Sequence, residues 1–155
     1  MRNRVYGTDR MGAEEAAEEL RLSAETEKLG EVLEFIDARL EAADCPMKVQ
    51  MQIDIAIEEL FVNIAHYAYA PDKGEAVIRI RIEEAAGDRP ARAFIELRDS
   101  GKPFDPTAKP DPDVTLSLEE RQIGGLGIYM AKKNMDKISY RCEDGQNILL
   151  VEKNL

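Results

Sequence analysis

Residues 53–70 constrain the fold of this chain most, because apolar side chains occupy nearly every side of a run long enough for a helix. Such a helix is stable only when other elements cover it, so 47–69 is predicted to be a core helix. One thin polar stripe crosses it. At 100° per residue, Glu59, Asn63 and His66 fall within an arc of about 60°. Polar groups on a core helix need partners, so this stripe is the first candidate for a site.

The stripe has two interpretations. It is either the solvated strip of an amphipathic helix or one side of a pocket. In a pocket, the Asn63 amide oxygen suits a hard cation such as Mg²⁺, and the Glu59 carboxylate can take a proton. Glu58 points about 100° away and is expected to be solvated. His66 is the only histidine, and such a residue is more often packed and hydrogen-bonded than catalytic.

The rest of the chain combines helical and strand patterns. Apolar residues recur at helical spacing over 25–42, and a third helix is expected over 128–135. Period-two alternation predicts strands at 19–23, 76–83, 92–98, 138–142 and 148–151. The fold class is therefore α+β, a two-layer sandwich with helices over one face of a mixed, mostly antiparallel sheet.

Composition limits the function classes. The 155 residues suit one domain, with 1–18 as a weakly ordered extension and 19–155 as the domain. A net charge of −10 argues against a nucleic-acid partner. No apolar run reaches the roughly 18 residues of a membrane span, and the N-terminus lacks a secretory apolar region. Two cysteines fit reduced thiols. We expect a cytoplasmic protein without membrane attachment.

Two glycine-marked turns follow the core helix. Asp99 ends a strand and precedes Ser-Gly101. This is either an ordinary turn or a base-binding turn, in which the carboxylate accepts from an exocyclic amine such as adenine N6. In the second case, Gly101 lets a flat base approach the backbone.

The second turn, Gly124-Gly125-Leu126-Gly127, opens a helix. Backbone N–H groups at a helix N-terminus form an anion site suited to phosphates. The spacing matches neither the dinucleotide fingerprint nor the Walker A loop. Between the two turns, residues 103–122 hold four of the seven prolines, and a loop of this length is typical of a lid.

In order, Glu59-x-x-x-Asn63, Asp99-x-Gly101-x-Pro-Phe104-Asp and Gly125-x-Gly127 resemble the ATP-binding domain of gyrase, heat-shock chaperones, histidine kinases and mismatch-repair ATPases. Within it, the compact chain resembles the bacterial anti-sigma factors that are serine-protein kinases. The resemblance covers about 19–155.

The resemblance implies a role for each matching residue. Asn63 would hold Mg²⁺ against the triphosphate, and Glu59 would be the general base. Asp99 would bind the adenine amine, with Gly101 beneath the ring. The remaining nucleotide contacts would come from Phe104, Gly124, Gly125, Leu126 and Gly127, with 105–123 as the ATP lid. The implied cofactors are ATP and Mg²⁺. The implied partners are a sigma factor and an anti-sigma-factor antagonist, and the implied assembly is a homodimer.

Two positions depart from the family pattern. Gln146-Asn147 stand where a threonine often follows the glycine, and Ile123 stands where an arginine near the phosphates is usual; Arg121 is the nearest replacement. Two hypotheses therefore compete. The first is a serine/threonine-protein kinase acting on the antagonist. The second is a module that binds ATP and sequesters a protein without phosphoryl transfer. A histidine kinase is disfavoured, because His66 lies inside the ATP helix.

Overall fold

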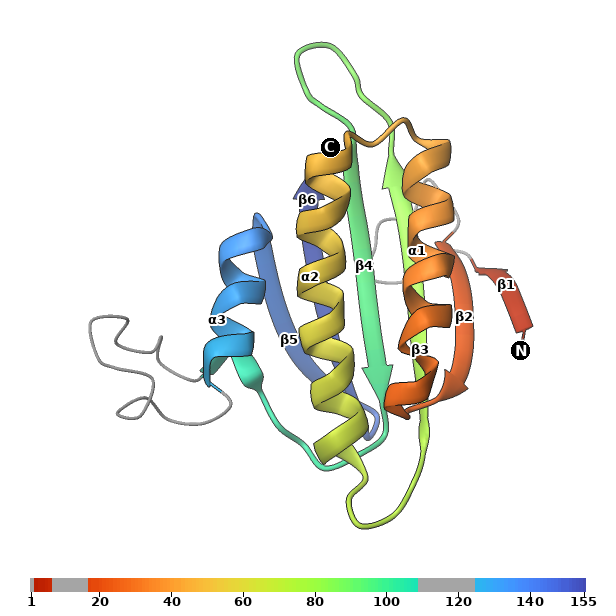
Figure 1. Cartoon of the computed structure of the whole chain (residues 1–155), viewed down its shortest axis with the longest axis vertical. Helices are drawn as coiled ribbons and strands as arrows, with labels where there is room; N and C mark the ends of the chain where they lie inside the picture. The colour runs from red at the N-terminus through yellow and green to blue at the C-terminus, as the bar shows by residue number, and fades with distance from the viewer. Residues whose placement is uncertain (1, 7–16, 109–124) are drawn as a thin grey trace.

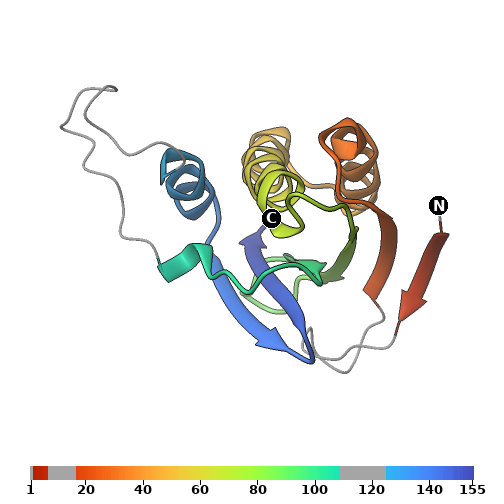
Figure 2. The ribbon, with the colours of Figure 1, turned by 90° about the horizontal axis from the view of Figure 1, so that it is seen from below.

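A computed structural model describes residues 2–6, 17–108 and 125–155. These residues form two layers, with the helices packed on one face of a single sheet (Figures 1 and 2). Both α1 and α2 lie across the centre of the sheet, and α3 lies beside α2 over β5 and β6. The α+β sandwich predicted from the patterns is confirmed.

The sheet has the strand order β1-β2-β3-β4-β6-β5 among the described residues. Every described pair of neighbouring strands is antiparallel, so the expected mixed sheet is purely antiparallel there. The strands are β1 (Arg2–Tyr6), β2 (Ala17–Ser23), β3 (Glu75–Glu83), β4 (Arg92–Asp99), β5 (Lys137–Glu143) and β6 (Gln146–Asn154).

Local chemistry explains the turn between β5 and β6. Asp144 and Gly145 have φ angles of 52° and 78°. Two consecutive positive φ values are typical of a type I′ turn, whose twist matches that of the flanking strands. This turn sets the register of β6 against β5. The pairing of β6 with β4 on its other side places Asn147 directly opposite Asp99.

The helices supply the core from one side. A 3₁₀ turn (Thr26–Lys28) leads into α1 (Leu29–Ala42), and α2 (Met47–Asn63) continues as a π-helical turn (Ile64–Ala68). The third helix is α3 (Gly125–Asn134). Full burial of a large apolar side chain contributes about 1.5–3 kcal/mol. Between α2 and the sheet, the fully buried side chains include Ile53, Ile57, Leu60, Phe61, Ile78, Ile80, Ile95 and Leu97.

The opposite sheet face carries paired charges. Glu96 is fully buried, and its carboxylate accepts a hydrogen bond from the Arg98 guanidinium at 2.8 Å. Guanidinium nitrogens of Arg79 and Arg141 lie 3.8 Å from the same carboxylate. A buried carboxylate needs such compensation, because removing a charge from water is costly.

The domain boundaries remain a prediction. Strand β1 lies inside the expected extension 1–18, while residues 1 and 7–16 lie outside the described ranges. Most of the expected lid, 109–124, also lies outside them; its first turn is a 3₁₀ turn (Pro106–Ala108). In the described part of the chain, each helix is too short or too polar to cross a bilayer.

Candidate functional site

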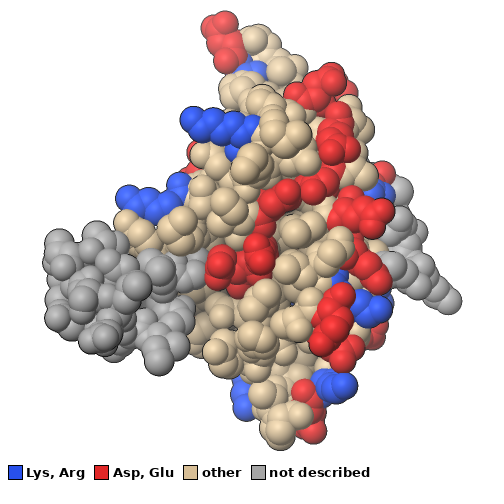
Figure 3. Space-filling model, in the orientation of Figure 1, with Lys and Arg blue, Asp and Glu red and all other residues tan. Residues whose placement is uncertain are grey.

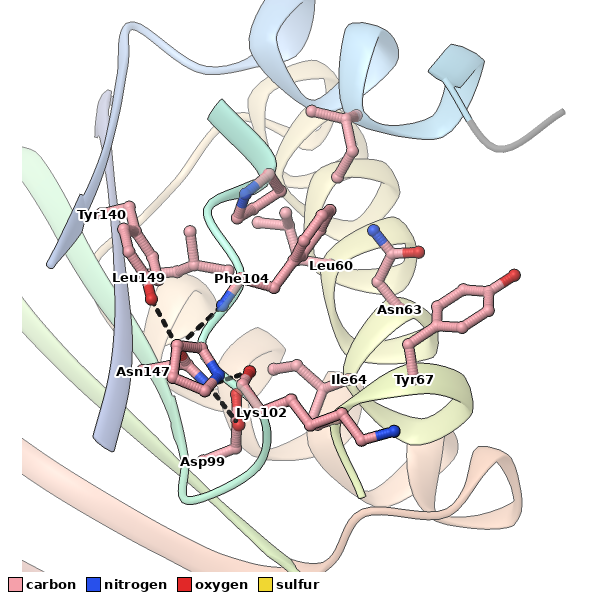
Figure 4. A pocket seen from close by; sticks show the side chains of 14 residues that line it. Leu60, Asn63, Ile64, Tyr67, Asp99, Lys102, Phe104, Tyr140, Asn147 and Leu149 are labelled. Atoms are coloured by element: carbon pink, nitrogen blue, oxygen red, sulfur yellow. Dashed lines mark hydrogen bonds between the residues drawn. The ribbon is translucent and has the colours of Figure 1, made fainter. Parts of the chain in front are cut away.

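A cavity of about 520 Å³ lies between the end of α2, the turn after β4, the β5–β6 hairpin and the start of α3. Its volume suits a small-molecule ligand. Figure 4 shows Asp99, Asn147 and Tyr140 at the sheet end of this cavity, and Asn63 and Tyr67 on the helix side. The predicted helix stripe and the Asp-x-Gly turn therefore meet at one cavity.

The helix side of the cavity is one face of α2 and of the π-helical turn that follows. Its lining residues are spaced at three and four positions: Leu60, Asn63, Ile64, Tyr67 and Ala68. Such π-helical turns are frequent at functional sites. The half-buried Asn63 side chain makes no hydrogen bond with another described residue, so its amide oxygen is available to a ligand.

The sheet end of the cavity is a fixed carboxylate. Asp99 is 5% exposed, and its Oδ1 accepts two hydrogen bonds of 2.9 Å, one from the Gly101 backbone N–H and one from the Asn147 side-chain amide. Its Oδ2 has no partner among the described residues. One oxygen is therefore held in place while the other is left for a ligand.

Asn147 organises this end of the cavity. Its Oδ1 accepts from the Phe104 backbone N–H at 3.3 Å and from the Tyr140 hydroxyl, and its Nδ2 also donates to the Lys102 carbonyl at 3.0 Å. The amide thus joins β4, the turn after it and β5. Burial raises the pKa of the Tyr140 phenol, so the hydroxyl stays protonated as a donor. Of the two replacements considered for the family threonine, Asn147 is the one in the cavity.

Gly101 is required for a reason that the sequence did not show. A Cβ on this residue would lie 2.2 Å from the Ala68 carbonyl oxygen, and the adjacent Lys102 N–H donates to that oxygen at 2.8 Å. Gly101 does not line the cavity. Its small size therefore lets the turn pack on the end of the π-helical turn, whereas contact with a bound base remains a prediction.

Of the other predicted nucleotide contacts, some line the cavity and some lie outside the described residues. Phe104 lines the cavity with its side chain 51% exposed. Gly124 lies outside the described residues, and α3 begins at Gly125, with Leu126 and Gly127 in its first turn. Ile128, in the same turn, lines the cavity. The N-terminus of α3 is therefore beside the cavity, as expected for a phosphate site.

Glu59 lies one turn before Asn63, on α2. Its side chain is half-buried but is not among the residues that line the cavity. Glu58 is exposed, which confirms the solvated position expected for it. The prediction that His66 is packed and hydrogen-bonded was wrong. The residue is exposed, and its ring contacts the Tyr67 ring edge-on, with 5.9 Å between the ring centroids. The widened π-helical turn explains this, because it breaks the 100° spacing after Asn63.

Sequence reasoning missed several lining residues, among them the polar side chains of Tyr67, Lys102 and Tyr140. The spacing of Tyr67 from Asn63 carried a signal, because residues four apart share a helix face. Tyr140 carried none, since only the β5–β6 register brings it to Asn147. Lys102 adds a positive charge beside the cavity.

A metal ion in this cavity would have few protein ligands. The described residues contain no set of three or more His, Cys, Asp or Glu that could hold a metal ion. Mg²⁺ is commonly bound by one or two protein groups together with substrate phosphates. The free Asn63 amide oxygen fits this arrangement.

Comparison with known proteins agrees with this geometry. A model of the histidine kinase-like ATPase domain matches residues 22–153. The chain belongs to this family. The histidine kinase-like ATPase fold thus places Asp99 and Asn63 about one cavity, and the resemblance drawn from the motifs is confirmed.

Relatives of this ATPase domain include named kinases. Serine/threonine-protein kinase BtrW of Bordetella bronchiseptica is 26% identical over 102 residues, which cover 66% of this chain and 68% of the relative. Serine-protein kinase RsbW of Bacillus cereus and that of Bacillus anthracis are each 31% identical over 102 residues, or 63% of this chain and 60% of the relative. The chain matches about three fifths of the length of these RsbW proteins.

Proposed function

We propose that this chain binds ATP·Mg²⁺ in the cavity and transfers the γ-phosphoryl group to a serine or threonine of an anti-sigma-factor antagonist. The observation that carries the nucleotide site is the Asp99 carboxylate, which is held by two hydrogen bonds and has one oxygen without a described partner. Adenine N6–H is a matching donor. Leu60, Ile64 and Leu149 add apolar surface for the ring.

The phosphates extend towards α3 and α2 in this proposal. Backbone N–H groups at the start of α3, which begins at Gly125, bind the phosphate oxygens, helped by the helix dipole. Lys102 adds positive charge. Asn63 contributes an oxygen ligand to Mg²⁺, which neutralises charge on the triphosphate when bound.

Glu59 is the general base of the proposed transfer. The hydroxyl oxygen of the acceptor serine bonds to the γ-phosphorus as the bond to the β–γ bridging oxygen breaks. The serine proton passes to the Glu59 carboxylate, and ADP leaves. Catalysis in such a reaction comes from positioning and charge neutralisation. Glu59 is half-buried one helical turn from Asn63, which suits a group that meets a docked protein rather than the nucleotide base.

The proposed partners come from the resemblance to the anti-sigma factors that are serine-protein kinases. A cytoplasmic regulator of this type would hold a sigma factor and exchange it for an antagonist, with the phosphate on the antagonist controlling the exchange. The relatives BtrW and RsbW are named as protein kinases. Sigma-factor binding, antagonist phosphorylation and a homodimer are proposals for this chain.

The test is transfer of labelled phosphate from ATP to the antagonist encoded beside this protein's gene. We expect labelling of a single serine or threonine. Glu59→Gln should reduce the rate at least about a hundredfold while ATP affinity stays within twofold, because a general base contributes about 10²–10⁴ in rate. Glu84→Gln is the control, since Glu84 is an exposed glutamate of the β3–β4 turn and does not line the cavity.

A second candidate function is sequestration without transfer. Glu59 is absent from the cavity lining, and Asn147 replaces the family's threonine. In this case ATP acts as a structural ligand of a protein-binding module. Tight ATP binding, an unlabelled antagonist and unchanged partner binding by the Glu59→Gln variant would favour sequestration over the kinase.

A further inference from the structure

The outer face of α1 and α2 carries an acidic band, made of five carboxylates that follow helical spacing. On α1 they lie at i, i+3 and i+7, and on α2 at i and i+4; the members are Glu34, Asp37, Glu41, Asp54 and Glu58. Figure 3 shows red side chains continuing across this helical face. The face is therefore strongly negative over a length of several helical turns.

The acidic band makes no ion pair with the described part of the chain. None of its five carboxylates pairs with a described Lys or Arg. The Gln50 side chain is 6% exposed and donates to Glu41 at 3.4 Å, but its Oε1 is buried without a described partner. Asp37 and Asp54 each leave a buried Oδ1 without a hydrogen bond as well.

Crowding in the acidic band changes its protonation. Burial, followed by a hydrogen bond and charge from Asp37 and by the charge of Glu41, raises the pKa of Asp54 to about 8. The nearby Cys45 thiol also has a raised pKa, from burial and from Asp37 and Asp54. Asp54 therefore holds a proton near neutral pH, and a cationic group placed beside the band would favour its charged form.

An apolar stripe runs beside the band on α2. Met47, Met51 and Ile55 lie at i, i+4 and i+8 and are 66%, 57% and 39% exposed. Exposed large apolar side chains that gather on one face are typical of protein-binding surfaces. Methionine is common on such surfaces because it adapts to different partners. None of the three lines the nucleotide cavity.

We propose that the apolar stripe and the acidic band together form a docking surface for a basic amphipathic helix of a partner protein. The apolar side of that helix packs on Met47, Met51 and Ile55, and its lysines or arginines pair with the acidic band. Recognition by an amphipathic helix uses this spacing of anchors, and complementary charge sets its orientation. The proposal does not depend on nucleotide binding.

The negative charge of the acidic band favours a cationic helix over other binding partners. A second copy of the chain, related by a twofold axis, would bring the acidic band close to its own equivalent, which costs energy through like-charge repulsion. An anionic lipid surface would be repelled for the same reason. A cationic helix removes repulsion that the free protein already contains.

The experiment measures binding of the full chain to a synthetic helix of leucine and lysine, with a leucine and glutamate helix of equal length as its counterpart. We expect the lysine peptide alone to bind. The double variants Met51→Ser/Ile55→Ser and Glu41→Gln/Glu58→Gln should each weaken binding at least tenfold. Glu84→Gln/Asp88→Asn, which alters two exposed acids of the β3–β4 turn, is the charge-matched control and should change binding less than twofold.

Several results would overturn the proposal. Equal weakening by the control would show attraction to net charge only, and unchanged binding by Met51→Ser/Ile55→Ser would exclude the stripe. If the chain self-associates as its concentration rises and Met51→Ser/Ile55→Ser abolishes this, the face binds a second copy of the chain. If the chain binds phosphatidylserine vesicles and Met51→Ser/Ile55→Ser abolishes this binding, the face binds a lipid surface.

Discussion

The two ends of the cavity are built differently. At the sheet end, Asp99 and Asn147 share a hydrogen-bond network that includes the Tyr140 hydroxyl and the backbone after β4. At the helix end, the Asn63 amide makes no hydrogen bond with another described residue. A preorganised polar group favours one ligand shape, whereas a free group is available to an ion or phosphate. For the ATP site proposed here, the difference predicts that the base is recognised by fixed geometry and the triphosphate by ligands gathered on binding.

The largest effect is expected from Gly101→Ala, which disrupts the sheet end. The new Cβ would lie 2.2 Å from the Ala68 carbonyl oxygen, so the turn must move away from the π-helical turn. We expect a loss of about 2–3 kcal/mol in the free energy of unfolding, measured in urea, and no detectable ATP binding. Gly30→Ala is the control, because a Cβ there meets nothing within 4 Å. Normal ATP affinity in Gly101→Ala would refute this packing.

Asp99→Asn tests the role of the Asp99 Oδ2 atom, which has no described partner, and keeps the hydrogen bonds to Gly101 and Asn147. The Asn side chain can keep its oxygen towards Gly101 and Asn147, and then presents an amide donor where the carboxylate offered an acceptor. ATP affinity should fall about a hundredfold, because a donor then faces the adenine amine. Affinity for inosine triphosphate, whose O6 is an acceptor, should fall less. Isothermal titration with both nucleotides measures the ratio, and an unchanged ratio would contradict the assignment.

Asn147→Ala removes the centre of the network. The Asp99, Lys102, Phe104 and Tyr140 groups would lose a partner in a buried setting. Unsatisfied buried groups cost about 1–3 kcal/mol, so the free energy of unfolding should fall by about 2 kcal/mol, together with a moderate loss of ATP affinity. Thermal unfolding of Asn147→Thr provides the comparison with the family's usual residue. Full stability of the alanine variant would show that the network contributes nothing.

Asn63→Ala tests the helix end of the cavity, where the side chain has no described hydrogen-bond partner. Its amide has no described partner to lose, so stability without nucleotide should change by less than about 0.5 kcal/mol. ATP affinity should fall about tenfold in Mg²⁺ and remain equal to that of the unaltered protein in EDTA. The same loss with and without Mg²⁺ would assign Asn63 to the nucleotide rather than to the metal.

The smallest effect is expected outside the cavity, at Asp54. Its pKa is about 8 in the folded chain against 3.8 as its ordinary value, so the folded state holds the proton through this range. The free energy of unfolding should therefore fall as pH rises from about 4 to 8. Asp54→Asn should remove this slope and add about 1 kcal/mol at pH 8, a value reduced by solvent screening. ATP affinity should not change. A pH slope unaltered by the substitution would contradict the raised pKa.

Local patterns predicted the elements well, because each depends on neighbours in the sequence. The helix over 47–69 and the strands at 76–83 and 92–98 follow from apolar spacing, and α2, β3 and β4 confirm them. The turn at Asp99 was also placed next to the core helix by motif order. These features needed no long-range information.

The remaining features depend on contacts between distant segments. Asn147 reaches Asp99 only through the register of β6 against β4, 48 positions away. The need for glycine at 101 comes from the Ala68 carbonyl, and the π-helical turn that places this carbonyl also moves His66 to the surface. Helical geometry alone could not reveal either effect.

The most direct test of the account is the thermal unfolding of the full chain with ATP, with and without Mg²⁺. At about 100 times its dissociation constant, ATP should add roughly 2.7 kcal/mol to the free energy of unfolding. For a chain of this size that raises the melting temperature by about 5–10 °C. The account predicts this rise with ATP and Mg²⁺, a smaller one in EDTA and almost none in Asp99→Asn. An unshifted melting temperature with ATP, or an equal rise in Asp99→Asn, would contradict it.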